Sequence, residues 1–346
     1  MKQRIWKIGL LMFLFGLSVN QTFAQECKEL IYEKDGKYYF NDGTMVTAKD
    51  KQSAILSYTN FKKGKEYFQN GDREFMNGNY KDAVEWFKKS WDLGYAMASS
   101  NLGYCYEYGL GVEKDIYKAF EHYMRAAQSG VAVAEYNVGR MLEENKNYEA
   151  AAEYYEKSAN QNNIGAQIKL GDCYYYGRGV RRNYSTAAQW YEKAAKQGDK
   201  EAQIDLAECY YDGTGVTQDY LEAFKWYVKA ANQGESDAQY QLGYMYSEGL
   251  GVTRDYAEAV RWYRKAADNG YADAFCSLAN KYYNGQGVTQ DYGKALELYH
   301  KAADKGVYRA MYMISVCYTY GHGVEKDLNQ ANYWKQKAKE LESKNK

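Results

Sequence analysis

The sequence contains no proline and only three histidines among its 346 residues. Without proline, its turns must depend on other turn-forming residues, of which glycine and aspartate are the usual ones. No charge of one sign prevails either, because 45 basic residues face 45 acidic ones. A balanced chain has no general attraction for nucleic acid or anionic lipid, so neither is an expected partner.

Long hydrophobic runs are also missing, apart from one near the N-terminus. Residues 8–19 are apolar, and this run of 12 is too short to cross a bilayer as a stable anchor. Basic residues precede it and Ala24 follows it, which is the organisation of a secretory signal peptide. We therefore expect residues 1–24 to be removed and the mature chain to be exported, soluble in a periplasm or outside the cell, without an integral membrane segment.

The scarcity of histidine argues against catalysis and metal binding. His122, His300 and His322 are widely separated in the sequence, and no His-Glu-x-x-His zinc motif occurs. The Gly-x-Ser-x-Gly turn that presents a nucleophilic serine is absent as well. The sequence therefore predicts a protein that is not an enzyme, with no catalytic residue, cofactor or metal.

What the sequence does contain is a repeat. Residues 210–234 read YYDGTGVTQDYLEAFKWYVKAANQG, and close variants follow at 246–270 and 282–306. The Gly-x-Gly-Val element occurs six times, and its last four intervals are all 36 residues. A phosphate-binding loop is used once or twice and needs Gly-Lys-Ser/Thr where this chain has Thr217-Gln218-Asp219. The six copies therefore indicate a structural turn of a repeat protein.

From residue 59 onward we divide the chain into eight units, each expected to form a helical hairpin. In the unit 235–270, a first helix (helix A) is predicted over 237–247 and a second helix (helix B) over 256–269. A loop over 248–253 joins them. The other seven units are 59–94, 95–130, 131–162, 163–198, 199–234, 271–306 and 307–342.

The apolar residues of this unit recur at helical spacing. Ala238, Leu242 and Tyr246 share one face of helix A and are expected to be core residues. Ala259, Trp262 and Ala266 form the equivalent stripe on helix B, with the tryptophan deeply packed. Replacing such a large core side chain by alanine costs about 3–5 kcal/mol.

Polar residues and glycines mark the ends of the two helices. Asp255 is predicted to cap helix B, with Glu258 three residues later completing a capping box. Gly249 and Gly251 are expected to take positive φ angles in the loop. Gly270 is expected to stop helix B in the left-handed conformation.

The six cysteines raise the question of disulfides in an exported chain. Four of them occupy equivalent positions in stacked units, where neighbouring helices lie about 8–10 Å apart. A disulfide requires Cα atoms within about 7 Å. We therefore expect free, buried thiols in the core, and only Cys27, outside the repeats, could pair between molecules. The four equivalent cysteines are Cys105, Cys173, Cys209 and Cys317.

The segment 25–58 precedes the repeats and has a different pattern. Residues 30–32, 37–40 and 44–47 are runs of β-forming residues. Lys34-Asp35-Gly36 and Asn41-Asp42-Gly43 separate them and are typical hairpin turns. The pattern predicts a small segment of β-hairpins that either caps the repeats or forms a flexible arm.

The repeated sequence resembles a known family. The pattern Ala-x3-Leu-Gly-x2-Tyr, then Gly-x-Gly-Val, then Asp-Tyr-x2-Ala-x2-Trp-Tyr-x-Lys-Ala-Ala is similar to the Sel-1-like repeat over residues 59–342. Stretches 77–90 and 143–159 lack the glycine loop and resemble tetratricopeptide repeats, a related hairpin. The resemblance implies an all-α protein: a right-handed α/α superhelical solenoid of helix-turn-helix repeats over 59–346, behind the small β segment. It also implies an adaptor or scaffold for protein partners.

The face of helix A opposite the core is the expected binding surface. Its residues vary between units while the core does not, and they are rich in tyrosine and acids, which suits an extended peptide or protein segment, possibly basic. The alternative is that these tyrosines pack between units and the acids only solvate the surface. The predicted groove comprises Tyr104, Glu107, Tyr108, Arg140, Asp172, Tyr175, Tyr176, Glu208, Tyr211, Asp212, Asp237, Tyr240, Tyr244, Ser247, Glu248, Asn280, Tyr283, Asn284 and Tyr320.

The resemblance also implies a second hypothesis. Secreted, cysteine-rich members of the family are linked to penicillin binding or β-lactamase activity, and they pair two cysteines within each repeat. In this chain each full unit has at most one cysteine. The expected function is therefore a non-catalytic, exported scaffold that binds a protein or peptide, and a penicillin-binding or β-lactamase type of protein is the alternative.

Overall fold

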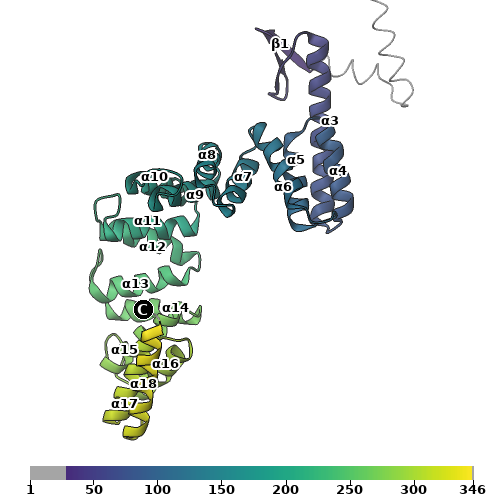
Figure 1. Ribbon diagram of the computed structural model, residues 1–346. Coiled ribbons are helices and arrows are strands. Elements are labelled where there is room, and N and C mark those ends of the chain that lie inside the picture. Colours follow the sequence, from purple (N-terminus) through teal and green to yellow (C-terminus); the bar gives the residue numbers. More distant parts are fainter. Residues whose placement is uncertain (1–28, 345–346) are drawn as a thin grey trace, which may run out of the picture. The chain divides into compact units, whose positions relative to one another are not determined.

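The computed structural model describes residues 29–344. The expected signal peptide, its cleavage position and Cys27 lie outside these residues. The described chain contains three strands and sixteen helices, labelled as in Figure 1. They form two compact units, the first ending at Asn145 and the second beginning at Lys146. The division therefore falls inside a repeat that lacks the glycine loop.

The first unit holds all three strands. They form an antiparallel sheet in the order β1-β2-β3, which confirms the predicted β segment. Its elements are β1 (Leu30–Lys34), β2 (Lys37–Phe40), β3 (Met45–Thr47), α3 (Lys51–Met76), α4 (Tyr80–Asp92), α5 (Ala96–Tyr108), α6 (Ile116–Gln128) and α7 (Ala132–Glu144).

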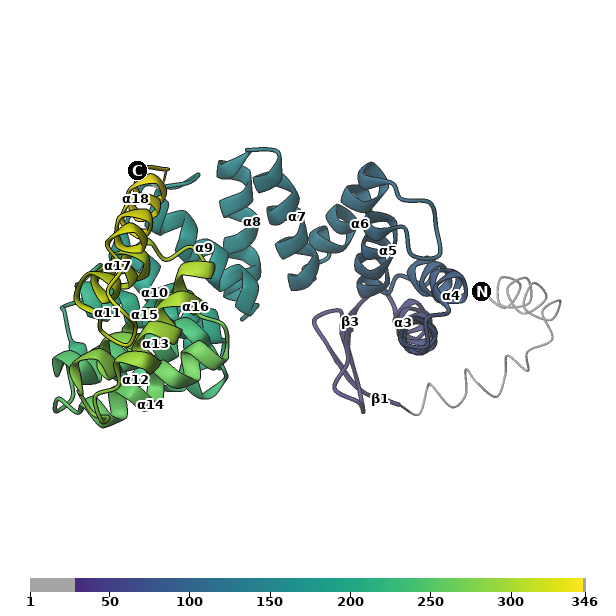
Figure 2. The same cartoon turned by 90° about the horizontal axis from the view of Figure 1, so that it is seen from below.

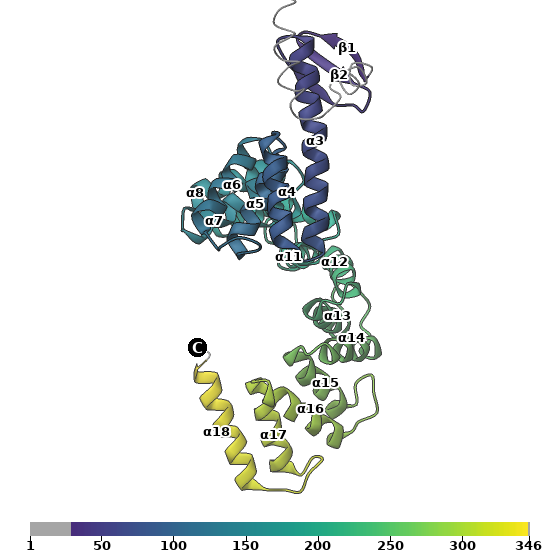
Figure 3. The same ribbon diagram turned by 90° about the vertical axis from the view of Figure 1, so that its right-hand side faces the viewer.

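The second unit is built from helices. Each helix in it packs against the next one along the chain, as Figure 3 shows for the later members. Its elements are α8 (Tyr148–Asn160), α9 (Ile164–Tyr176), α10 (Tyr184–Lys196), α11 (Lys200–Asp212), α12 (Tyr220–Asn232), α13 (Ser236–Glu248), α14 (Tyr256–Asp268), α15 (Ala272–Asn284), α16 (Tyr292–Asp304), α17 (Tyr308–Tyr320) and α18 (Leu328–Lys344).

The sheet lies beside α3 (Figure 2), at the N-terminal half of the helix (Figure 3). Phe40 stacks on Tyr58 of this helix, with ring centroids 3.8 Å apart, and both side chains are buried. The Tyr58 hydroxyl donates to Glu29 at 2.5 Å and to Asp42 at 3.0 Å. The helix begins at Lys51, eight residues before the first repeat was expected to start, because these added turns carry the apolar residues that cover the sheet.

The remaining helices form tandem hairpins, which confirms the all-α solenoid. Odd-numbered helices from α3 to α17 are the A helices and the even-numbered helices that follow them are the B helices. In every repeat that lies within one compact unit, the A helix packs against its B helix. In the repeat taken as the type, α13 extends one residue beyond the predicted range at each end, and α14 ends one residue earlier than predicted. The regular spacing of apolar residues and glycines is sufficient to place these helices.

The capping prediction for α14 is half right. The Asp255 side chain accepts hydrogen bonds from the backbone N–H groups of Ala257, at 2.8 Å, and Glu258, at 3.1 Å. The Glu258 carboxylate does not complete the box. It pairs with Arg261 at 2.6 Å, while the Asp255 N–H donates to the carbonyl of Tyr246. The repeat therefore has an N-cap without the reciprocal bond.

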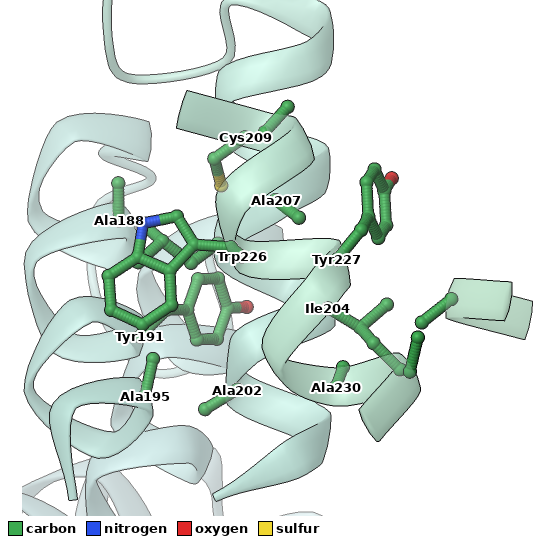
Figure 4. Packing of buried hydrophobic residues seen from close by; sticks show 14 of the residues in the cluster. Ala188, Tyr191, Ala195, Ala202, Ile204, Ala207, Cys209, Trp226, Tyr227 and Ala230 are labelled. Atoms are coloured by element: carbon green, nitrogen blue, oxygen red, sulfur yellow. The ribbon is translucent and has the colours of Figure 1, made fainter. Parts of the chain in front are cut away.

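The core of each B helix from α6 to α16 is centred on a tyrosine, and the prediction of a deeply packed Trp262 was wrong. Trp262 is only partly buried, whereas the next residue, Tyr263, is 3% exposed. The buried stripe of α14 runs through Ala259, Tyr263 and Ala266, so the tryptophan lies at its border. In the repeat before, the equivalent Trp226 is itself buried, at 8% exposure against 1% for Tyr227, and Figure 4 shows it beside Tyr191 of the neighbouring helix.

Glycines allow two close approaches within the hairpins. A Cβ on Gly243 of α13 would lie 2.6 Å from the ring of Tyr263, so the bare helix surface makes room for the core tyrosine. Gly251, in the loop, has φ of +65° as expected, and a Cβ there would collide with the backbone carbonyl of Tyr220. Each glycine loop therefore rests on the first turn of the preceding repeat's B helix.

The cysteines of the described chain are free and buried, as predicted. Cys105, Cys173, Cys209 and Cys317 lie on A helices, and Cys276 is a fifth buried thiol. Burial raises the pKa of the Cys209 thiol to about 12. Thiols with so high a pKa hold little thiolate at neutral pH, so these residues act as small core side chains.

Candidate functional site

The predicted groove residues do not all lie on the surface. Glu107 and Ser247 were expected to be exposed, but both are buried. Glu107 accepts from the Tyr123 hydroxyl at 2.9 Å and pairs with Arg140 at 2.5 Å. Ser247 accepts from the ammonium group of Lys281 at 2.6 Å. Their partners come from a later helix of the same or the next repeat, which the face of one isolated helix does not reveal.

The other predicted groove residues are accessible to different degrees. Tyr240 is half-buried and packs against the rings of Tyr263 and Tyr271, with centroids 5.6 and 5.0 Å apart. The packed-tyrosine alternative therefore holds at this position. The half-buried residues are Arg140, Asp172, Tyr175, Tyr211, Asp237, Tyr240, Asn280 and Tyr283. The exposed ones are Tyr104, Tyr108, Tyr176, Glu208, Asp212, Tyr244, Glu248, Asn284 and Tyr320.

Five predicted residues come together in one cavity between α9 and α11. This cavity, the acidic pocket, has a volume of about 100 Å³. None of the described residues that line it is basic, so its carboxylates face one another and the rings of three tyrosines. The acidic pocket is lined by Asp172, Tyr175, Tyr176, Tyr191, Asp205, Glu208, Cys209, Asp212 and Thr214.

Asp205 is the functional candidate that the sequence reasoning missed. Burial raises the pKa of its carboxyl to about 7, and the neighbouring carboxylates of Asp172 and Glu208 add to the shift. A sequence signal was available, because Asp205 stands three residues before Glu208 and seven before Asp212 on one face of α11. The predicted groove included only the more exposed positions of this helix and therefore omitted Asp205.

Tyr191 forms part of the floor of the acidic pocket and holds one of its acids. The tyrosine is 4% exposed and packs beside Gly171, while its hydroxyl donates to Asp172 at 2.9 Å. A hydrogen bond to a carboxylate favours its charged form. The pocket therefore combines an anchored carboxylate with a second carboxyl group, Asp205, that titrates near neutral pH.

A second cavity lies further along the A helices of the same unit. This cavity, the apolar pocket, has a volume of about 320 Å³ and spans α13, α15 and α17. Only Tyr240 and Asn280 of its lining belong to the predicted groove. The apolar pocket is lined by Tyr240, Asp273, Cys276, Ser277, Asn280, Arg309, Tyr312 and Met313.

The three histidines pack against aromatic rings in separate places. His122 stacks on Tyr106 with centroids 5.4 Å apart, and His300 meets the edge of Trp334. His322 stacks on Tyr292 at 4.4 Å. Within residues 29–344, no cluster of histidine, cysteine and acidic residues could hold a metal ion. Nor does any helix in that range have the length and apolarity to cross a membrane.

Tandem A and B hairpins with glycine loops define a helical repeat protein whose variable side chains lie on the A helices. Comparison with known proteins identifies the repeat, since stretches 60–95, 96–131, 132–163, 164–199, 200–235, 236–271, 273–307 and 309–343 match the Sel1 repeat. The chain belongs to the Sel1 repeat family, whose members are typically protein-interaction scaffolds and generally non-catalytic.

Two solved structures resemble the chain in fold and sequence. One is a protective antigen present in uropathogenic Escherichia coli strains, with 33% identity, a TM-score of 0.64, and coverage of 80% of this chain and 68% of that one. The other is a Sel1 repeat protein from Oxalobacter formigenes, with 36% identity, a TM-score of 0.57, and coverage of 60% and 85%.

The chain is also similar to parts of longer curated proteins. It is 38% identical over 89 residues to HRD3 of Candida glabrata, an ERAD-associated E3 ubiquitin-protein ligase component. This match covers 25% of the chain and 11% of the relative. The chain spans at most 30% of the length of the curated relatives that it matches, so the similarity concerns the repeats.

Proposed function

We propose that this protein is a non-catalytic scaffold whose A helices bind an extended segment of a protein partner. The observation that carries the proposal is the acidic pocket, where four acids and three tyrosines meet without a basic side chain among the described lining residues. Such a cavity is complementary to a lysine or arginine side chain, because carboxylates pair with the charge and tyrosine rings cover the apolar stem.

The surroundings of the pocket support a polypeptide ligand. Tyr176, on its rim, is 59% exposed, and Tyr244 on α13 is 38% exposed. Exposed tyrosines add contact area at a low cost in conformational entropy, which is why they are frequent in recognition surfaces. A basic residue of the partner would thus enter the acidic pocket while its neighbours lie over these rings.

The proposal includes the location of the protein and the division of its chain. The charged start and short apolar run support a signal peptide over residues 1–24, and the mature chain would then act in an exported location. Residues 25–58 would cap the solenoid that fills 59–346. Packing of the sheet on α3 supports the capping role.

A photo-crosslinking residue at Tyr176 or Tyr244 tests the proposed surface in cells that produce the protein. Arg264, exposed on the B helix α14, is the matched control position. We expect a defined protein to be captured from the two tyrosine positions only, with the crosslinked segment carrying lysine or arginine. Capture should be lost when Glu208→Gln and Asp212→Asn are added. Equal capture from Arg264, or capture that survives these substitutions, contradicts the proposal.

A further inference from the structure

The apolar pocket has the features of a second contact point on the same unit. Tyr240, Cys276 and Met313 bring side chains from three successive A helices to its wall. Its volume of about 320 Å³ is roughly three times that of the acidic pocket. A cavity of this size accepts a large side chain, and its walls would bury the apolar surface of that side chain from water.

Asn280 supplies a hydrogen-bonding group at the edge of this pocket. Its side-chain oxygen accepts from the hydroxyl of Tyr299 at 2.6 Å, and Tyr299 is fully buried. This bond engages the amide oxygen, so the amide nitrogen of this pocket-lining residue keeps its capacity as a donor. A donor beside an apolar cavity suits an extended peptide, whose backbone offers carbonyl groups while one side chain enters the cavity.

The charges at the apolar pocket cancel. Asp273 and Arg309 lie 3.8 Å apart at its edge, and both side chains are well exposed. An exposed pair of this kind contributes little energy and leaves no net charge. The acidic pocket, by contrast, collects acids alone. The two cavities are therefore complementary to different side chains, one basic and one uncharged and apolar.

We infer that the apolar pocket is the second anchor for the partner segment and takes a bulky apolar side chain of the same extended chain that places a basic residue in the acidic pocket. The inference rests on the proposed function. Packed helices lie about 8–10 Å apart, and the acidic pocket lies about two and a half such spacings from α15, or about 20–25 Å. An extended chain rises about 3.3 Å per residue, so about six to eight residues separate the two anchors.

Designed peptides test this spacing. Fluorescent peptides in a Gly/Ser background would carry one Arg and one Phe at separations from three to eleven residues, with Arg-only and Phe-only peptides beside them. Fluorescence anisotropy with the full mature chain gives the affinities. We expect peptides with separations of about six to eight residues to bind at least tenfold more tightly than either single-anchor peptide, because a tethered second anchor binds at high effective concentration.

Variants of the apolar pocket distinguish two-anchor binding from nonspecific hydrophobic binding. Ser277→Phe fills the apolar pocket and is expected to reduce two-anchor binding to the Arg-only level, leaving Arg-only binding unchanged. Met313→Gln keeps the side-chain length but makes the wall polar, and should cost about fivefold in the same peptides. Ser129→Phe, at an exposed position after α6, is the matched control and should change nothing. Thermal unfolding verifies that each variant is folded.

The outcomes separate the two proposals. If Phe adds nothing at any separation while Arg-only binding is lost in Glu208→Gln, the second anchor is wrong and the proposed function stands. If Arg-only peptides fail to bind, the basic anchor is wrong. In that case the Phe-only peptide decides. If Ser277→Phe abolishes its binding, the apolar pocket is still supported as a binding site. If its binding survives Ser277→Phe, or if it does not bind at all, the inference is overturned.

Discussion

The two units use carboxylates on their A helices in opposite ways. In the first unit, Glu107 is buried, accepts from Tyr123 and pairs with Arg140. In the second unit, Asp205 shares a pocket with other acids, and burial holds its pKa at about 7. The same scaffold thus neutralises one acid with an internal basic side chain and, in the proposed function, leaves another to the partner protein. A carboxylate with an internal partner belongs to the fold, whereas one without a basic neighbour is available for binding.

The largest expected effect tests whether the two units share one kind of core. Tyr123 in the first unit and Tyr263 in the second occupy equivalent positions, at 0% and 3% exposure. We expect Tyr123→Ala and Tyr263→Ala each to lower the free energy of unfolding by about 3–5 kcal/mol in chemical denaturation. Trp262→Ala should cost clearly less than Tyr263→Ala. If the tryptophan cost more, the assignment of the core to the tyrosines would be wrong.

The next effect concerns the neutralised acid. Arg140→Ala leaves the Glu107 carboxylate buried without its charged partner, so the free energy of unfolding should fall by about 3 kcal/mol. Replacing Arg125, whose ion pair with Glu121 is exposed, should cost less than about 1 kcal/mol and serves as the control. Similar losses in the two variants would remove the distinction between structural and available carboxylates.

Unlike the variants above, Asp205→Asn should raise the free energy of unfolding. Because the folded state raises the pKa of Asp205 to about 7, the wild type loses stability as pH rises from about 4, where the unfolded chain releases this proton, to about 7. At pH 8 the variant should be more stable than the wild type by about 2 kcal/mol, which is about half of what the full pKa shift would give because solvent screens this half-buried carboxyl group, and below pH 4 the two should be alike. Denaturation at several pH values measures this. A stability difference independent of pH would contradict the assignment.

The smallest effect involves acids that belong to neither group. Asp255 accepts two backbone N–H groups, so Asp255→Ala should cost about 1 kcal/mol. Glu258 makes only an exposed pair with Arg261, and Glu258→Gln should change stability by less than about 0.5 kcal/mol. Thermal unfolding resolves the difference. An equal loss in both variants would mean that the capping box forms in solution.

The helices and loops could be predicted from the sequence because the residues that define them recur at the same positions in several repeats. Gly251 and Gly270 recur at fixed positions, and both have the positive φ that the pattern predicts. The core tyrosine was harder to identify, because Trp262 and Tyr263 are adjacent and a period of 3.6 residues does not decide which of two neighbours faces inward.

The site was less predictable than the fold because its contacts cross between helices. Arg140 reaches Glu107 from 33 residues away, and that separation hid the burial of Glu107. The acidic pocket needed the spatial approach of α9 and α11, which no single unit encodes. Asp172, Glu208 and Asp212 nevertheless line one cavity, because all of them lie opposite the core of their own helices, and their role in binding a partner stays a prediction.

The contact between each glycine loop and the preceding B helix has a consequence for how repeats can be added to such a chain. The contact of Gly251 with the carbonyl of Tyr220 joins backbone to backbone, and the same contact recurs between the second loop glycine and the preceding B helix in the other five loops. A junction of this kind requires the loop glycine but does not depend on the side chain of the residue it contacts. Repeats can therefore be duplicated or exchanged without redesigning the joint, while the side chains of the A helices remain free to change with the partner.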